Sequence, residues 1–344
     1  MSEEFKRTEI ESLGEFKLIE RINEKFKLKN KSSIIGIGDD AAVLNFDDKQ
    51  IVVSSDILLE GVHFDLSYAP LPHLGYKAVS VNVSDIAAMN AIPTQITVNI
   101  SISNRFSVEA VDALYEGINH ACEDYNVDLV GGDTTASKEG LVISITAIGK
   151  ADAKDITLRN GAGKNDIICV TGDLGAAYLG LQVLEREKQV FLSNPEMQPE
   201  LDRYSYIVQR QLKPEAKTNI IHELRELNIK PTSMIDVSDG LASEVLHLAK
   251  SSNCGMVVYE DKLPVDDESF KTAEEFNMNI VTCALNGGED YELLFTIQQD
   301  DFEKLKNHSN IHTIGYVTDS KSGNKLVTRS GTVAELKAQG WKHF

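Results

Sequence analysis

Acidic residues beside glycine or serine, placed at six points along the chain, constrain the fold of this sequence more than any other feature. They are Asp39 with Asp40, Asp56, Asp85, Asp133, Asp236 with Asp239, and Glu289 with Asp290. Most of them directly follow or precede a short apolar run that is typical of a strand. One acid beside glycine is an ordinary turn signal, and a helix N-cap would explain Asp133 or Asp239 equally well. Six such points, several with paired acids, are more than turn formation requires.

Convergence of these acids in one place would require cations. Two carboxylates about 5 Å apart repel by roughly 3 kcal/mol at an effective dielectric constant of about 20. Ligand sets made only of oxygen atoms select hard ions, and Mg²⁺ is preferred where phosphate groups are also present. If the acids converge, the sequence therefore predicts several Mg²⁺ ions in a site that holds two phosphate-bearing molecules together.

No other catalytic pattern competes with the acids. The sequence lacks a P-loop, a GxGxxG turn, the HRD and DFG motifs of protein kinases, a GxSxG elbow and an HExxH pair. The turn at residues 171–175 (Thr-Gly-Asp-Leu-Gly) joins an expected strand to an expected helix. It would suit an anion at a helix N-terminus, and it would equally suit a plain strand-to-helix turn.

Charge and cysteine usage exclude several kinds of partner. The net charge of −19 argues against nucleic acid, since phosphate backbones attract basic surfaces. The cysteines are scattered without metal-ligand spacing, as is typical of reduced thiols. No apolar run approaches the roughly 18 residues of a membrane-spanning helix, and the acidic N-terminus is unlike a signal peptide. We therefore expect a cytoplasmic protein that binds neither nucleic acid nor a membrane.

The hydrophobic pattern predicts mixed strands and helices, which indicates an α/β or α+β fold with mixed sheets. Apolar and polar residues alternate over 94–103, as in a half-buried strand, and apolar residues recur at helical spacing over 107–125. We expect further strands at 33–38, 50–57, 127–130, 141–148, 166–170, 256–260, 291–297, 312–318 and 325–328, and one that runs into Asp236. Further helices are expected at 3–28 (a pair), 77–90, 174–187, 214–227, 241–251 and 267–277.

The length of the chain and one short polar segment suggest two domains. A chain of 344 residues is about twice the usual domain size. The polar segment 150–154 marks a boundary between residues 1–152 and residues 153–344. Residues 188–205 are polar and contain Pro195 and Pro199, so we expect a loop with little regular structure there.

Taken in order, eight sequence motifs resemble those of the thiamine-monophosphate kinase family. They are GEFKLI at 14–19, GIGDDAAV at 36–43, SDIL at 55–58 with GVHF at 61–64, GYKA at 75–78 with NVSDIAAM at 82–89, GGDTT at 131–135, RNGA at 159–162, IDVSDGL at 235–241 and GGEDYEL at 287–293. The resemblance extends from about residue 10 to the C-terminus. Ser55 stands where the family often has Thr, and Asn90 stands where it usually has Gly.

The family belongs to the superfamily of aminoimidazole ribonucleotide synthetase, and the resemblance implies a fold and an assembly. Members have two α/β domains, and their N-terminal domains pair their sheets across a homodimer. By this resemblance, residues 1–152 would bind ATP and Mg²⁺ and form the dimer, and residues 153–344 would complete the substrate site.

The resemblance also implies an activity, the ATP-dependent phosphorylation of thiamine monophosphate, and a set of residues for it. Mg²⁺ would be held by Asp40, Ser54, Ser55, Asp56, Asp85, Asp133 and Asp236, with Asp239 for a further ion. ATP would contact Tyr115, Gly132, Asp133, Arg159 and Ser238, and thiamine monophosphate would contact His63, Glu289 and Trp341. Asp85, Asp133 and Arg159 would serve catalysis. The acceptor phosphate is already an anionic nucleophile, so we expect direct in-line transfer.

Simpler explanations remain open for single residues and for the whole chain. On spacing alone, His63 is a packed or solvent-facing histidine, Arg159 a surface arginine, Tyr115 a core residue and Trp341 the cap of a core edge. The alternative functions are another ATP-using enzyme of the same superfamily and a non-catalytic nucleotide-binding protein. Superfamily members that rely on a reactive cysteine near one terminus fit poorly, because the first cysteine here is Cys122.

Overall fold

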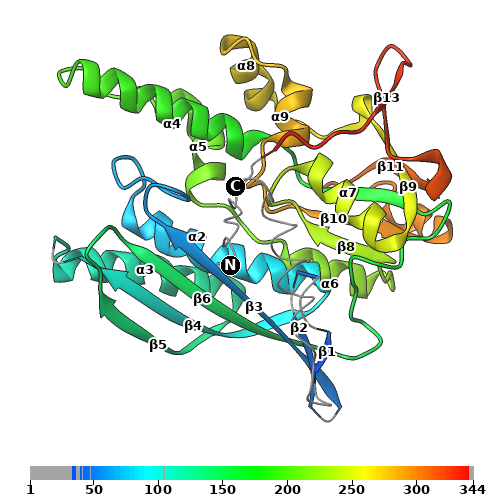
Figure 1. Cartoon of the computed structure of the whole chain (residues 1–344), viewed down its shortest axis with the longest axis horizontal. Helices are drawn as coiled ribbons and strands as arrows, with labels where there is room; N and C mark the ends of the chain where they lie inside the picture. The colour runs from blue at the N-terminus through cyan, green and yellow to red at the C-terminus, as the bar shows by residue number, and fades with distance from the viewer. Residues whose placement is uncertain (1–32, 36–38, 41, 47, 104, 341–344) are drawn as a thin grey trace, which may run out of the picture.

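The computed structural model describes residues 33–35, 39–40, 42–46, 48–103 and 105–340. The helix pair expected at 3–28, the end of the strand expected at 33–38, and Trp341 lie outside the described residues. Within them the chain builds two mixed sheets with helices, one sheet from each half of the chain (Figure 1). The expected fold class, an α/β fold with mixed sheets, is confirmed.

The first sheet has six strands in the order β1-β2-β3-β6-β4-β5. Their bounds are Ser33–Ile35 (β1), Ala42–Phe46 (β2), Lys49–Leu59 (β3), Ile92–Ile102 (β4), Asp128–Ala136 (β5) and Val142–Ala151 (β6). Only β4 and β5 pair in parallel. Side chains alternate between the two faces of a strand, and β4 accordingly buries Ile96 and Val98 on one face and exposes Asn99 on the other. One face of this sheet is therefore core, and the opposite one is open.

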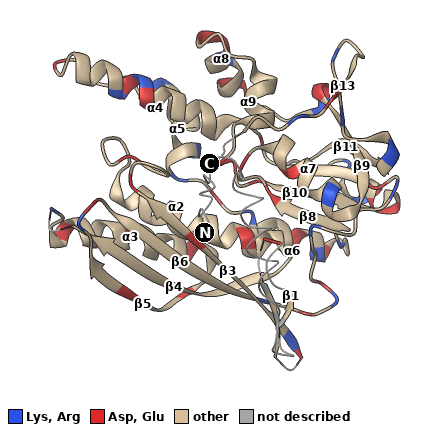
Figure 2. Cartoon of the chain, in the orientation of Figure 1, with Lys and Arg blue, Asp and Glu red and all other residues tan. Residues whose placement is uncertain are grey.

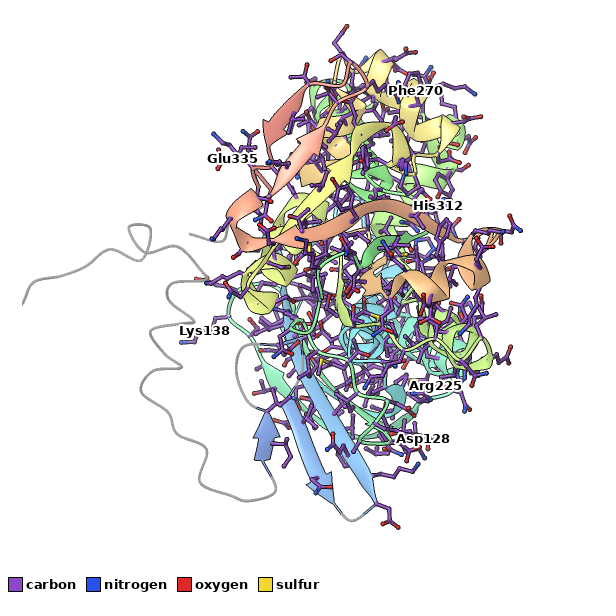
Figure 3. All side chains as sticks on the ribbon, turned by 90° about the vertical axis from the view of Figure 1, so that its right-hand side faces the viewer. Asp128, Lys138, Arg225, Phe270, His312 and Glu335 are labelled. Carbon is purple, nitrogen blue, oxygen red and sulfur yellow. The ribbon has the colours of Figure 1, made fainter. Side chains whose placement is uncertain are left out.

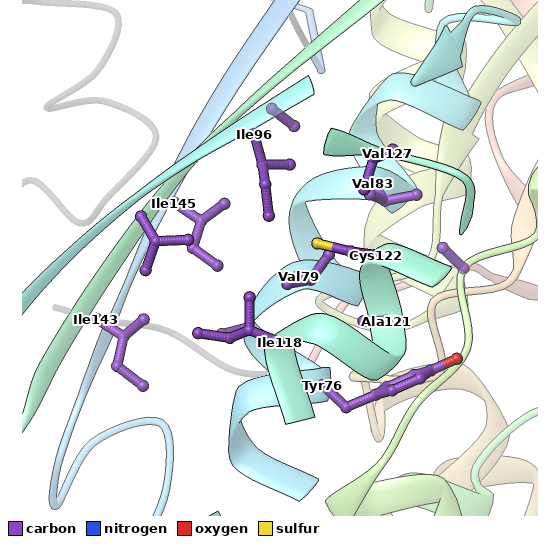
Figure 4. Packing of buried hydrophobic residues seen from close by; sticks show 14 of the residues in the cluster. Tyr76, Val79, Val83, Ile96, Ile118, Ala121, Cys122, Val127, Ile143 and Ile145 are labelled. Atoms are coloured by element: carbon purple, nitrogen blue, oxygen red, sulfur yellow. The ribbon is translucent and has the colours of Figure 1, made fainter. Parts of the chain in front are cut away.

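Two helices, α2 (Leu71–Ala88) and α3 (Val108–Tyr125), cover the core face. Figure 4 shows Val79 and Val83 of α2 and Ile118 and Cys122 of α3 turned toward Ile143 and Ile145 of β6. Two glycines let the helices touch. A Cβ atom on Gly75 would stand 2.1 Å from the Leu114 carbonyl oxygen, and one on Gly117 would stand 1.8 Å from that of Pro72.

The second sheet has seven strands in the order β13-β12-β9-β11-β7-β10-β8 and is covered on both faces. Its strands are Ile167–Thr171 (β7), Ser233–Asp236 (β8), Cys254–Tyr259 (β9), Leu293–Ile297 (β10), Ile311–Asp319 (β11), Lys325–Val327 (β12) and Val333–Glu335 (β13). Leu294 of β10 packs with α7 (Leu241–Ser252), while Leu293 and Phe295 pack with α6 (Thr218–Glu226). Since successive side chains of a strand point to opposite faces, α7 and α6 lie on opposite sides of the sheet.

Four further helices form a separate layer beside the second sheet and share one apolar cluster: α4 (Ala176–Ser193), α5 (Ser205–Leu212), α8 (Asp267–Glu275) and α9 (Ile280–Asn286). The short α10 (Phe302–Leu305) packs with α6, because Leu305 belongs to the same apolar cluster as that helix. No helix in the described ranges is both long and apolar enough to cross a membrane.

The two halves of the chain share a core where α2 ends. Ala87 and Ala88 belong to the same apolar cluster as α6 and β10. Arg225 of α6 donates a hydrogen bond to the Asn90 carbonyl oxygen at 2.7 Å. Asn90 has a φ of 55°, a conformation that glycine adopts freely and that asparagine tolerates better than most residues. Figure 3 shows the halves stacked, with Phe270, His312 and Glu335 in the second and Asp128 and Lys138 in the first.

Most expected elements are confirmed, and the corrections have physical causes. The prediction of a loop over 188–205 is wrong at both ends of that segment, because α4 continues to Ser193 and α5 begins at Ser205. The run from Glu185 to Gln189 contains good helix formers and precedes the first proline, so nothing ends α4 where polarity rises.

Two expected strands end too early. The strand expected over 50–57 continues as β3 to Leu59, so Asp56 lies inside it, and the strand expected over 127–130 continues as β5 to Ala136, so Asp133 also lies within a strand. The Gly-Gly pair before Asp133 looks like a turn, but a Cβ atom on Gly132 would stand 1.8 Å from the Val98 carbonyl oxygen. Glycine is needed there for close contact within the sheet.

Candidate active site

The turn after β8 and the loop before β10 lie side by side and carry acids from both. β8 and β10 pair with Asp236 opposite Leu293. Beyond this pair, backbone hydrogen bonds join the Tyr291 amide to the Val237 carbonyl oxygen at 2.9 Å and the Glu289 amide to that of Ser238 at 2.7 Å. Glu289 is therefore fixed beside the turn that holds Asp236, Ser238 and Asp239.

Three carboxylates from distant parts of the chain meet in front of this turn. Asp40, Asp85 and Asp236 each offer an oxygen atom, and these atoms all lie within 4.8 Å of one another. A fourth acid, Asp56, lies close enough for its charge to raise the pKa of Asp85. We call Asp40, Asp56, Asp85 and Asp236 the acid cluster. Asp and Glu are spread over both halves of the molecule (Figure 2), so an acidic surface does not account for this convergence.

Hydrogen-bond donors orient the acid cluster. Ser84 donates to Asp236 at 2.6 Å, and Ser54 donates to Asp85. Arg159 binds Asp40 through Nε at 3.1 Å and through a second guanidinium nitrogen. The serines come from α2 and β3, and Arg159 from the segment between the sheets, so both halves of the chain fix the site.

Burial and mutual repulsion keep the acids from ionising freely. Burial raises the pKa of Asp85 well above its ordinary range, and Asp56, Asp236 and Asp40 raise it further. Burial and then the charge of Asp40 raise the pKa of Asp236 to about 7, although the Ser84 hydrogen bond opposes the rise. A divalent cation would relieve this repulsion, and a ligand set made only of oxygen atoms fits Mg²⁺.

A cavity of about 1060 Å³ opens onto the acid cluster from between the two halves. Asp56, Asp85 and Asp236 line it together with Ser238 and Asp239. Two of the three residues expected to contact the acceptor, His63 and Glu289, also line it, and the third, Trp341, lies outside the described residues. The His63 ring accepts a hydrogen bond from the Leu59 amide at 3.1 Å through Nδ1, which fixes its orientation.

Four expected residues lie apart from the acid cluster within one chain. Ser55 pairs with Thr146 and Ile57 pairs with Ser144 on β6. Because side chains alternate along a strand, those of Ser55 and Ile57 point away from the face that carries Ser54 and Asp56. Asp133 pairs with Asn99, on that same open face, and Gly132 precedes it. Tyr115 packs against the core of the first half.

Several residues of the site escaped the sequence analysis. Lys77 of α2, whose side chain is 4 % exposed, donates to Glu289 Oε2 at 3.1 Å across the junction. Glu244 is buried beneath Asp239 and accepts a hydrogen bond from its amide at 3.0 Å. Tyr291 lines the cavity. A lysine within a run of small and apolar helix residues was the available signal for Lys77; pattern alone offers none for Glu244.

Fold and site together place the chain in one class of proteins. Residues 38–151 match the family model for the N-terminal domain of AIR synthase related proteins, and residues 163–326 match the model for their C-terminal domain.

Comparison with individual proteins identifies the family within that class. The chain is 34 % identical over 338 residues to the thiamine-monophosphate kinase of Bacillus subtilis, which covers 96 % of this chain and 100 % of that protein. It is 33 % identical over 340 residues to the thiamine-monophosphate kinase of Buchnera aphidicola, over 96 % and 99 % of the two chains. A solved structure described as AaThiL complexed with AMPPCP and TMP superimposes with a TM-score of 0.83 at 32 % identity, over 98 % and 99 %. The chain belongs to the thiamine-monophosphate kinase family and is a kinase.

Proposed function

We propose that this kinase transfers the γ-phosphoryl group of ATP to the phosphate of thiamine monophosphate, which yields thiamine diphosphate and ADP. The observation that carries the proposal is the cavity of about 1060 Å³ that opens onto the acid cluster. Its volume lies at the upper end of the roughly 300–1,000 Å³ typical of small-ligand pockets. The names of the relatives and the ligands of AaThiL support the choice of substrates.

We propose that the acid cluster, with Ser54 and Asp239, holds several Mg²⁺ ions. The bound ions would neutralise phosphate charge and stabilise the charge that develops during transfer. Arg159, already bound to Asp40, adds a fixed positive charge at the edge of the cluster. For ATP we propose contacts with Tyr115, Gly132, Asp133, Arg159 and Ser238, and for the acceptor contacts with His63, Glu289 and Trp341.

We infer a homodimer formed through the open face of the first sheet. This face carries Ile57, an apolar side chain that is 51 % exposed and that a second copy would cover. It also carries Ser55 and Asp133, whose proposed metal-binding role needs a site outside their own chain's acid cluster. A second copy seated on this face would supply one. We propose that residues 1–152 and residues 153–344 are the two domains, because each range holds one sheet. The first of them would form the dimer.

We infer direct in-line transfer. The residues of the chain would position the two phosphates and hold their charges, with Asp85, Asp133 and Arg159 as the catalytic groups. A covalent relay would need a free nucleophile, and the acids at the cavity are better suited as metal ligands. Transfer from ATP that is chirally labelled at the γ-phosphorus should therefore invert that centre once. Net retention, or a labelled phosphoenzyme trapped without acceptor, would show a covalent relay.

A coupled assay of ADP release with ATP and Mg²⁺ tests the reaction. Thiamine monophosphate should sustain turnover, and free thiamine, which lacks the acceptor phosphate, should sustain little. ADP release with thiamine as the better acceptor would contradict the proposed acceptor. ATP binding without ADP release would favour the non-catalytic alternative, and turnover only with a different acceptor would favour another enzyme of the superfamily. The four cysteines are free and mostly buried, which fits a reaction in the cytoplasm.

A further inference from the structure

The loop before β10 has an unusual backbone. Gly288, Glu289 and Tyr291 all have positive φ angles, of 74°, 58° and 50°. Residues other than glycine, asparagine and aspartate rarely adopt this backbone conformation. Where one does, surrounding contacts enforce it. Here the hydrogen bonds of Glu289 and Tyr291 to the 237–238 backbone enforce it. The result is that Glu289 and Tyr291, two residues apart, both line the cavity.

The Tyr291 hydroxyl differs from those of other buried tyrosines. Tyr291 is 9 % exposed, and within the described ranges no residue forms a hydrogen bond with its hydroxyl group. By contrast, the Tyr76 hydroxyl donates to Asp124 at 3.0 Å and the Tyr204 hydroxyl donates to Glu275 at 2.6 Å. The Tyr291 hydroxyl is not among the buried polar atoms that lack a partner, so it is accessible from the cavity that Tyr291 lines.

The surroundings of Tyr291 define which partner would suit its hydroxyl. Tyr291 lines the cavity together with Asp56, Asp85 and Asp236 of the acid cluster. A tyrosine phenol keeps its proton below about pH 10 and can therefore donate a hydrogen bond there. Its neighbours belong to the acid cluster, where the proposed function places phosphate groups. A phosphate oxygen is the acceptor that such a donor would meet there.

We propose that Tyr291 is a phosphate-binding residue whose hydroxyl donates a hydrogen bond to a non-bridging phosphate oxygen lying against the acid cluster. The inference rests on the proposed function, because it takes the cavity to hold phosphates. Both the transferred group of ATP and the acceptor monophosphate offer this chemistry. The positive φ at Tyr291 turns the side chain into the cavity, and this direction accounts for the strained backbone.

The variant Tyr291→Phe tests the proposal, because it removes the hydroxyl alone. One hydrogen bond to a charged group corresponds to about a 10- to 100-fold loss of affinity or of kcat/KM. We expect that loss for one substrate, in full-length protein with Mg²⁺, while the unfolding temperature stays within about 2 °C. Tyr316→Phe, on β11 and 40 % exposed, is the matched control and should behave as the wild type.

Calorimetric binding separates the sources of the phosphate. A weaker complex with AMPPCP assigns the hydrogen bond to the nucleotide, and a weaker complex with thiamine monophosphate but unchanged binding of thiamine assigns it to the acceptor. Wild-type binding of both phosphates, or equal weakening of thiamine and its monophosphate, would overturn the proposal. Lack of kinase activity in the wild type would contradict the proposed function alone, since phosphate binding would still be measurable.

Discussion

Asp85 is the most constrained residue of the site. It accepts a hydrogen bond from Ser54, and one of its oxygen atoms lies within 4.8 Å of oxygen atoms of Asp40 and Asp236. Sequence reasoning found all four acids, because each belongs to a short segment that combines acids with glycine or serine near an apolar run. It did not find which of them face one another. Ser55 and Asp56 are adjacent yet face opposite sides of β3, and the face depends on strand register, which a single sequence does not reveal.

Replacing Asp85 with asparagine should lower turnover by at least about 100-fold, because a carboxylate at the centre of the proposed metal site is lost. The fold should survive. Burial and repulsion penalise the charged form of Asp85, so without metal the variant should unfold at the same temperature as the wild type or higher. Activity assays and thermal unfolding in EDTA measure both effects, with Asp128→Asn on the exposed strand β5 as control. Wild-type turnover in Asp85→Asn would contradict the assignment.

The stability of the metal-free protein should fall as pH rises from about 4 to about 7. Asp236 has its pKa raised from 3.8 to about 7 by burial and by Asp40. Between these values the unfolded chain has released the proton that the folded chain still holds, so a rising pH favours unfolding. Added Mg²⁺ competes with this proton and should raise the unfolding temperature more at about pH 8 than at about pH 5. A Mg²⁺ effect independent of pH would refute the linkage.

At the scale of elements, long periodic segments were predictable and turn chemistry was less so. The strand over 94–103 and the helix over 107–125 follow from alternation and helical spacing, and both are confirmed by β4 and α3. The helix α9 was missed because its apolar stretch is short, and β5 was cut short at its glycines. Gly132 serves contact with a neighbouring strand, and contacts between strands leave no trace in local sequence.

Gly132→Ala should destabilise the protein by about 2–4 kcal/mol, since its new Cβ would stand 1.8 Å from the Val98 carbonyl oxygen at a φ of 152°. Gly131→Ala is the matched control, because its Cβ would have its nearest neighbour at 3.9 Å, an ordinary contact. Denaturant unfolding compares the two variants. Equal stability would mean that β5 pairs with β4 in another way.

At the scale of the whole molecule, sequence motifs indicated two domains but not how they join. The junction depends on Lys77 reaching Glu289 and on Ala87 and Ala88 entering the core of the second half. Such contacts link residues more than a hundred positions apart, and their pairing is set only by the folded arrangement. The open face of the first sheet is the other large-scale feature, and it leads to the proposed dimer.

Ile57→Lys should convert the dimer to a monomer, because it places a charge on the open face where the second copy is proposed to bind. Val333→Lys, at a side chain 57 % exposed on β13 of the second sheet, should leave the dimer intact. Sedimentation velocity distinguishes the two states. A wild type that is monomeric at every concentration would contradict the dimer and leave Asp133 without its proposed role.

The proposed function depends on the acid cluster being a metal site at which two phosphates meet. Its most direct test is a crystal of the protein grown with Mn²⁺ in place of Mg²⁺, AMPPCP and thiamine monophosphate, measured at the manganese absorption edge. We predict anomalous peaks within about 2.5 Å of carboxylate oxygens of Asp85 and Asp236, with phosphate groups of both ligands bound to the same ions. Ligands bound in the cavity with no anomalous peak at the acid cluster would contradict the account.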